Sequence, residues 1–284
     1  TFCCIFLLFF AINLLPCERM PRHLLCYFLF NGQQTTACRS VTLVFSRRWA
    51  SRRNRCNARQ DAIFANEPHN NDFDTQPRVH VLPLVYHSNY SCPFPENHRF
   101  VMSKFRRLHA YCEQQGLIGS SNLFQPESVS KAVMSIAHDM DYLQMISEQN
   151  DDTDPVNKKA WRRIGLPWSQ GLVDRTFTAP NGTLLTAQLA LQYGMASHLA
   201  GGTHHAHRNF GSGFCLLNDL AFAALSLLHN GEANRVLIFD LDVHQGDGTA
   251  AILANEPRAF TCSIHCEKNF PFRKSASDLD IGLD

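Results

Sequence analysis

The stretch FDLDVHQGDGT at 239–249 places two carboxylates and an imidazole at alternate positions, Asp240, Asp242 and His244. If this segment stays extended, alternate side chains point to the same side, and ligands of open parallel sheets bind at the carboxyl ends of strands. Two carboxylates and one imidazole suit a divalent ion such as zinc, and Asp247 can reach back from the next turn. The alternative is an Asp-rich loop that caps the following helix.

A second stretch, AGGTHHAH at 200–207, sets His204 and His205 side by side after a glycine pair. Glycine lets a backbone approach a ligand closely. Adjacent imidazoles suit proton transfer, one as base and one as electrostatic aid, when buried acids orient them. A lone histidine is usually structural, whereas a pair in a glycine-bounded turn favours catalysis.

A third stretch, GSGFCLLND at 211–219, puts Phe214 and Cys215 at the start of a predicted helix. It is not a dinucleotide-binding loop, because Leu216 stands where the third glycine belongs. We interpret Cys215 as a small buried residue beside the site.

Together, GGTHHA, GFCLLND and DLDVHQGDGT, in this order, resemble the zinc-dependent histone deacetylase superfamily. Shorter segments such as VYHSNY, AHDMDYL and SDLDIGL extend the likeness from about residue 80 to the end of the chain. The sequence is most similar to the class IV and bacterial-like members. An arginase-like dinuclear manganese enzyme fits less well, since GFC and the adjacent histidines are not its pattern.

The resemblance implies a role for each matching residue of the two charged motifs. Asp242 and His244 would be zinc ligands, and zinc would polarise the amide carbonyl of an acylated lysine and activate a water. His204 and His205 would manage protons, with His205 as the general base. Their orienting carboxylates would be Asp240 for His204 and Asp247 for His205.

Substrate and potassium sites are implied in the same way. Gly213 would offer its carbonyl to the substrate, and Phe214 and Phe270 would form the walls of the acyl-lysine tunnel. A structural K⁺ site would use the following residues: Asp240, Asp242, His244, Ser263 and Ile264.

One departure concerns the C-terminus. In the family, the third zinc ligand, an aspartate, and a transition-state tyrosine come later than Asp284, where this chain ends. We therefore expect a catalytic domain that is incomplete at its C-terminus. It is either a fragment of an active enzyme or a truncated protein that binds zinc poorly.

The elements that must position these residues alternate between strands and helices. Apolar runs predict strands at 235–242 and 259–266, and helical spacing predicts helices at 98–116 and 181–194. Residues 150–155, NDDTDP, are predicted to form a polar turn. Strands that are apolar on both faces indicate an α/β fold, an open, mostly parallel sheet flanked by helices, as the arginase/deacetylase resemblance also implies.

Charge divides the 284 residues into two parts. Residues 1–60 hold nine arginines and one acid, a net charge of +8, while the rest carries −7. We predict an N-terminal targeting segment and linker at 1–75 and a catalytic domain at 76–284. An Arg-rich, acid-poor arm is typical of a transit peptide and predicts a plastid or mitochondrial location, with nucleus or cytoplasm as the alternative. The competing interpretations of the arm are nucleic-acid binding and a tail without a role.

The apolar opening run of about fifteen residues is short for a membrane span, which needs roughly twenty. It is either a signal-peptide core or a segment that precedes a true start at Met20. Eleven cysteines, an odd number without a C-x-x-C pair, are interpreted as reduced intracellular thiols.

The expected function is zinc-dependent removal of acyl groups from lysine side chains of histones or other proteins. The alternatives are deacetylation of small amines such as polyamines and a truncated, non-catalytic binding protein. We expect no nucleic-acid binding by the catalytic domain and no membrane span, and the oligomeric state is left open.

Overall fold

The computed structural model describes residues 7–8, 82–148 and 154–284. The strands are β1 Leu7–Leu8, β2 Leu84–Val85, β3 Leu123–Phe124, β4 Ser197–His198, β5 Val236–Asp240, β6 Ala259–Cys266 and β7 Leu279–Leu283. The helices are η1 Ser88–Tyr90, α2 Lys104–Gln114, α3 Lys131–Met134, α4 Met140–Ser147, α5 Pro155–Ile164, α6 Gln170–Tyr193, α7 Asp219–His229 and α8 Asp247–Leu253. Apart from β1, the predicted N-terminal segment at 1–75 lies outside the described residues.

The strands form two hydrogen-bonded groups. One has the order β1-β4-β2-β3, with β1 antiparallel and the others parallel, and the second has the order β5-β6-β7, all parallel. The prediction of an open, mostly parallel sheet flanked by helices is confirmed. Parallel neighbours bring their carboxyl ends to one edge, which is where the predicted site residues follow β4 and β5.

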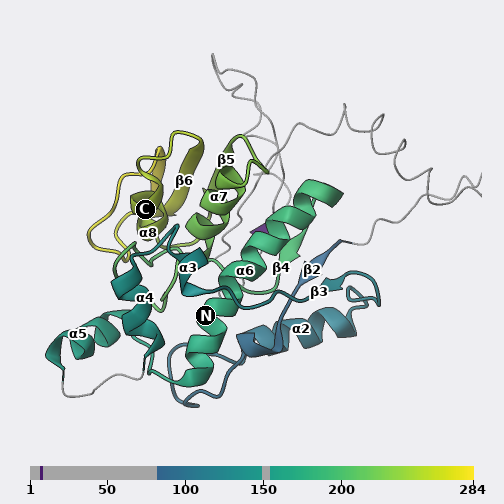
Figure 1. Cartoon of the computed structure of the whole chain (residues 1–284), viewed down its shortest axis with the longest axis horizontal. Coiled ribbons are helices and arrows are strands. Elements are labelled where there is room, and N and C mark those ends of the chain that lie inside the picture. Colours follow the sequence, from purple (N-terminus) through teal and green to yellow (C-terminus); the bar gives the residue numbers. More distant parts are fainter. Residues whose placement is uncertain (1–6, 9–81, 149–153) are drawn as a thin grey trace, which may run out of the picture.

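Helices join the two groups of strands (Figure 1). The long helix α6 packs against β2 and β4, and it also packs against α7, which contacts β5 and α8. Ala187 of α6, Leu227 of α7 and Ile238 of β5 belong to one buried apolar cluster at this junction. That shared core fixes the end of β4 relative to the end of β5.

Three details differ from the sequence prediction. Helix α2 begins at Lys104, not at 98. Helix α6 begins at Gln170, not at 181, because Ser169 caps it by accepting a hydrogen bond from the Leu172 amide, and the helix continues past Pro180. The predicted polar turn at 150–155 contains the start of a helix that the sequence analysis missed. Asp154 caps α5 with a hydrogen bond from the Val156 amide, and Pro at the first helical position is favourable.

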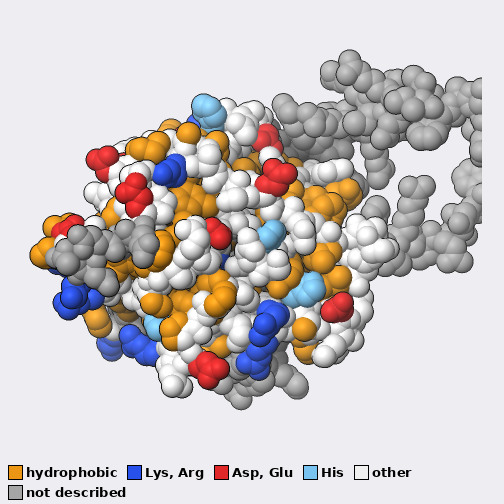
Figure 2. Space-filling model, turned by 60° about the horizontal axis from the view of Figure 1, so that its bottom comes forward, with side chains coloured by type: hydrophobic (Ala, Val, Ile, Leu, Met, Phe, Trp, Pro, Cys, Tyr) orange, Lys and Arg blue, Asp and Glu red, His pale blue; other side chains and the backbone are white. Residues whose placement is uncertain are grey.

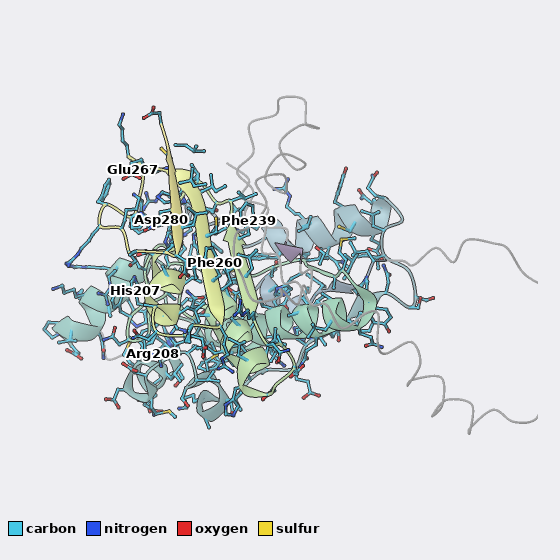
Figure 3. All side chains as sticks on the ribbon, turned by 90° about the horizontal axis from the view of Figure 1, so that it is seen from above. His207, Arg208, Phe239, Phe260, Glu267 and Asp280 are labelled. Atoms are coloured by element: carbon cyan, nitrogen blue, oxygen red, sulfur yellow. The ribbon has the colours of Figure 1, made fainter. Side chains whose placement is uncertain are left out.

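One face of the β5-β6-β7 group is apolar and partly open. Phe239 and Phe260, labelled in Figure 3, lie on neighbouring strands of this face, and Phe260 is 43% exposed. Leu279 and Leu283 of the edge strand β7 are also exposed. Unpaired strand edges with apolar side chains favour association, so this end of the molecule is less protected than the α6–α7 core.

Charged side chains of both signs share the face of the molecule that Figure 2 shows. On the face turned forward in Figure 2, acidic and basic side chains lie among hydrophobic and neutral ones. Within the part of the chain that the structure describes, no helix combines the length and apolarity that crossing a bilayer requires.

Candidate active site

Two histidine–carboxylate pairs lie side by side at the ends of β4 and β5. His204 Nδ1 is 2.5 Å from Asp240 Oδ2, and His205 Nδ1 is 2.7 Å from Asp247 Oδ1. The two imidazole centroids are 4.1 Å apart. All four residues are buried, so both contacts are shielded from water and strengthened by the low local dielectric.

The two imidazoles differ in protonation. Burial alone would lower the pKa of His204, but the charge and hydrogen bond of Asp240, with charge from Asp242 and Asp247, raise it to about 9. Burial and the neighbouring His204 lower the pKa of His205 to about 4, despite its hydrogen bond to Asp247. At neutral pH these shifts favour a protonated His204 and a neutral His205. The contact of His205 Nδ1 with the Asp247 carboxylate favours the tautomer that has its proton on Nδ1 and leaves Nε2 as an acceptor.

The backbone under the histidine pair is held by the start of α7. Asn218 Nδ2 donates to the carbonyls of His204 and Ala206, and the Thr249 amide also donates to the His204 carbonyl. Asp219 accepts from the Gly202 amide and from the amide and hydroxyl of Thr203. The turn that presents the two imidazoles is thus fixed by buried polar side chains.

Asp242 and His244 lie next to the histidine pair. Asp242 is buried, and its Oδ1 is 2.9 Å from His244 Nδ1 and 3.9 Å from His204 Nε2. A carboxylate oxygen and an imidazole nitrogen are donor types that zinc uses, so this pair fits a zinc ion as two of its ligands. The described residues contain no group of three His, Cys, Asp or Glu side chains placed to hold a metal.

The segment that carries these acids turns tightly at Gly246. A Cβ atom at this position would lie 2.5 Å from Asp240 Oδ2 and 3.3 Å from His204 Nδ1. Only a residue without a side chain lets the backbone pass this close to the pair. The glycines that follow His244 in the sequence are therefore part of the site.

The predicted substrate residues occupy two sides of the site. Phe270 lies 4.9 Å from His205 and 6.1 Å from His244, measured between ring centroids. Gly213 has φ +54°, and a Cβ there would lie 2.6 Å from His205 Cδ2 and 2.9 Å from Phe270 Cε1. Phe214, with φ +65°, packs 5.7 Å from Phe100. Gly213 and Phe270 thus flank His205, while Phe214 follows Gly213 in the chain and contacts Phe100.

The residues predicted for potassium are also close in the fold. Asp240 is the register partner of Ser263 across the β5–β6 ladder, and Ile264 follows on β6. The buried Ser263 hydroxyl is 3.0 Å from His265 Nδ1. Potassium binding and the catalytic and binding roles assigned above stay predictions.

Sequence reasoning missed two members of this cluster. His207, labelled in Figure 3, places Nε2 3.0 Å from Asp247 Oδ2, so one carboxylate serves His205 and His207 together. Asp219 is the second, since its carboxylate binds the turn before His204. For His207, the third histidine of the THHAH motif was a signal that the sequence offered. The role of Asp219 is visible only from its tertiary contacts.

The chain is similar to proteins of one known family. The histone deacetylase domain family matches residues 98–283, which is more than half of the chain. An uncharacterized protein of Picosynechococcus is 52% identical over 202 residues, 71% of this chain and 66% of that protein. Histone deacetylase 8 of Xenopus tropicalis is 31% identical over 214 residues, 71% of this chain and 56% of that protein.

Solved structures show the same fold. A crystal structure of a histone deacetylase homologue from Aquifex aeolicus has a TM-score of 0.57 and 21% identity, covering 71% of this chain and 58% of that one. A homologue complexed with SAHA has a TM-score of 0.58 and 22% identity, with the same coverage.

This chain belongs to the histone deacetylase family. It spans less than two thirds of the length of the relatives named above.

Proposed function

We propose that this chain carries the proton-transfer centre and two zinc ligands of a hydrolase that removes acyl groups from lysine side chains. The observation that carries this proposal is the pair of buried dyads, His204–Asp240 and His205–Asp247. Membership of the histone deacetylase family supports the class of reaction.

The chain's own residues supply acid–base chemistry. The neutral His205, with Nδ1 held by Asp247, accepts a proton from a water at Nε2 and returns it to the leaving amine. The cationic His204, held by Asp240, stabilises negative charge that develops beside it. When zinc is bound by Asp242 and His244, it supplies Lewis-acid polarisation of the substrate carbonyl.

The substrate proposed is an acylated lysine of a histone or another protein. Phe270 stands against His205, and aromatic walls favour the methylene chain of a lysine over a polar group. An acetylated polyamine carries a similar amide on an alkyl chain, so the same centre serves for the alternative substrate class.

The test is turnover by the full chain in the presence of zinc, measured on an acetyl-lysine peptide and an acetylated polyamine. We expect the higher kcat/KM on the peptide, and His205→Ala to lower it by roughly 10²–10⁴-fold. The matched control is His229→Ala at the exposed end of α7, which should keep wild-type activity.

Normal activity in His205→Ala would exclude the proposed base. Higher kcat/KM on the polyamine would move the substrate class to small amines. A folded wild-type chain with no turnover on either substrate would contradict the proposal for this chain and favour a non-catalytic binding protein.

A predicted plastid or mitochondrial location remains part of the proposal. Its support is the acid-free, arginine-rich stretch between Arg19 and Gln60. A fluorescent fusion of residues 20–75 that stayed in the cytosol or nucleus would exclude it.

A further inference from the structure

The loop between β6 and β7 is held together by one lysine. Lys274 Nζ donates to three backbone carbonyls of this loop, those of Glu267 at 3.0 Å, Asn269 at 2.9 Å and Pro271 at 2.9 Å. A lysine ammonium has three donors and no acceptor, so these bonds use all its donors. Lys274 therefore cross-links its own loop.

A buried glutamine fixes the end of the same loop. Gln245, which is 1% exposed, accepts from the Ser275 amide at 3.0 Å and donates to the Ser275 carbonyl at 2.6 Å. Its amide nitrogen also donates to Asp280 Oδ1 at 2.8 Å. Because Gln245 directly follows His244, the loop is joined to the segment that carries the predicted zinc ligands.

The start of the loop is attached to the edge strand. The Glu267 amide donates to the Leu283 carbonyl of β7 at 2.9 Å, and Figure 3 shows Glu267 and Asp280 on this side of the sheet. Between the two attached ends the loop crosses residues 268–273, and Lys274 holds that middle part through the Asn269 and Pro271 carbonyls.

The middle of the loop carries Phe270, the aromatic side chain next to His205. The ring stands edge-on to the His205 imidazole, with 4.9 Å between centroids and an interplanar angle of 78°. Two of the three carbonyls that Lys274 binds, those of Asn269 and Pro271, belong to the residues directly before and after Phe270. The lysine bonds therefore hold the backbone on both sides of the ring.

We propose that Lys274 is a positioning residue: through its bonds to the loop it sets how far the Phe270 ring stands from His205, and so how closely this ring can contact a substrate beside His205. This inference rests on the proposed function, since it treats Phe270 as a wall for the acyl-lysine substrate. A neutral, apolar side chain at position 274 cannot donate the three hydrogen bonds to the loop carbonyls, so the Phe270 loop becomes more mobile. The His205–Asp247 pair does not depend on these bonds and stays in place.

The first test is hydrogen exchange of the full chain in wild type, Lys274→Met and Lys268→Met. Lys268 is the matched control because it lies in the same loop, 83% exposed, with Nζ 4.0 Å from Asp284 Oδ1. Amides of 267–275 should exchange at least about ten-fold faster in Lys274→Met. They should stay at the wild-type rate in Lys268→Met, and α7 should be unchanged in both variants.

The second test is steady-state kinetics on the acetyl-lysine peptide. Lys274→Met should raise KM about ten-fold and change kcat by less than about two-fold, because the wall binds substrate while the proton-transfer pair is intact. A merely structural role would lower the active fraction and therefore kcat, with KM unchanged. Lys268→Met should match the wild type in both constants.

Unchanged exchange in Lys274→Met, or an equal rise in both variants, would overturn the proposal, as would a lower kcat with unchanged KM. If α7 also loses protection in Lys274→Met, then Lys274→Arg decides. Its planar guanidinium keeps the charge but does not match the three carbonyls, so faster exchange confined to 267–275 supports the proposal and wild-type exchange overturns it. Absence of turnover in the wild type contradicts the proposed function alone, and exchange still tests the lysine cross-link.

Discussion

The candidate site has two parts that are held in different ways: the histidine pair, which we call the floor, and the loop that carries Phe270, which we call the wall. The floor, His204 and His205, rests on the side chains of Asn218, Asp219 and the orienting aspartates, which are all buried. The wall rests on a half-buried lysine and on β7, whose residues are mostly exposed. Buried, fully bonded polar groups are costly to disturb, whereas a loop at a sheet edge is cheap to alter. We therefore expect substitutions under the histidine pair to cost stability, and substitutions in the Phe270 loop to change how substrate binds.

The largest effect is expected where the floor is attached to α7. Asp219 is fully buried and accepts four hydrogen bonds, from the Gly202 amide, the Thr203 amide and hydroxyl, and the Thr183 hydroxyl. Asp219→Ala leaves those donors unsatisfied and should lower the free energy of unfolding by about 4 kcal/mol. Urea denaturation measures this loss.

The control for Asp219 is Asp141→Ala, an exposed acid in the first turn of α4. It should lose less than about 1 kcal/mol. Similar losses in the two variants would mean that burial of the floor contributes little.

The second-largest effect is expected at low pH, which should lower the free energy of unfolding through buried histidines next to the floor. Burial lowers the pKa of His138 and of His198 to about 4, and His138 Nε2 must stay unprotonated to accept from the Asn218 amide at 2.9 Å. Below the ordinary histidine pKa of about 6.5, the unfolded chain binds protons that the folded chain does not bind until about pH 4. The stability that these two neutral imidazoles contribute is therefore complete above pH 6.5 and falls as the pH drops toward 4, by at most about 3 kcal/mol for each imidazole.

Urea denaturation between pH 7 and pH 5 measures this slope. His138→Gln removes one of the buried imidazoles, so its slope should be shallower than that of the wild type. A free energy of unfolding that stays constant from pH 7 to pH 5 would contradict the assignment of neutral, buried histidines.

A smaller effect is expected where floor and wall meet. A methyl group in Gly213→Ala would enter the space between His205 and Phe270 and strain a residue with φ +54°. We expect a loss of about 2 kcal/mol in stability together with reduced turnover. Gly116→Ala is the matched control, since it has φ +67° but nothing within 4 Å of its Cβ. Equal effects would show that backbone strain alone, and not contact with the site, limits position 213.

The smallest effect on stability is expected on the partly exposed apolar face of the β5-β6-β7 strands. Phe260→Thr replaces a 43% exposed ring in β6 by a strand-forming polar residue. It should change the free energy of unfolding by less than about 1 kcal/mol and reduce light scattering at high protein concentration. A loss of more than about 2 kcal/mol would show that this ring is buried by a contact in solution.

Much of the fold could be predicted because local signals were strong. The strand at 259–266 and the helix closed by Gly194 follow directly from apolar runs and a terminal glycine. Helix α5 was missed because its cap, Asp154, stands in a polar run that is also typical of a turn. The start of α6 was missed because its buried threonines weaken the apolar pattern.

The sequence by itself determined which residues could do chemistry, since carboxylates and imidazoles at strand ends are recognisable by type and spacing. It also determined the family, through three motifs in a fixed order. Only the tertiary structure decided which acid serves which histidine, that His207 shares Asp247, and that Lys274 and Gln245 hold the Phe270 loop. The reason is physical: these contacts join residues from different loops, and their distances depend on how α6, α7 and the two groups of strands pack.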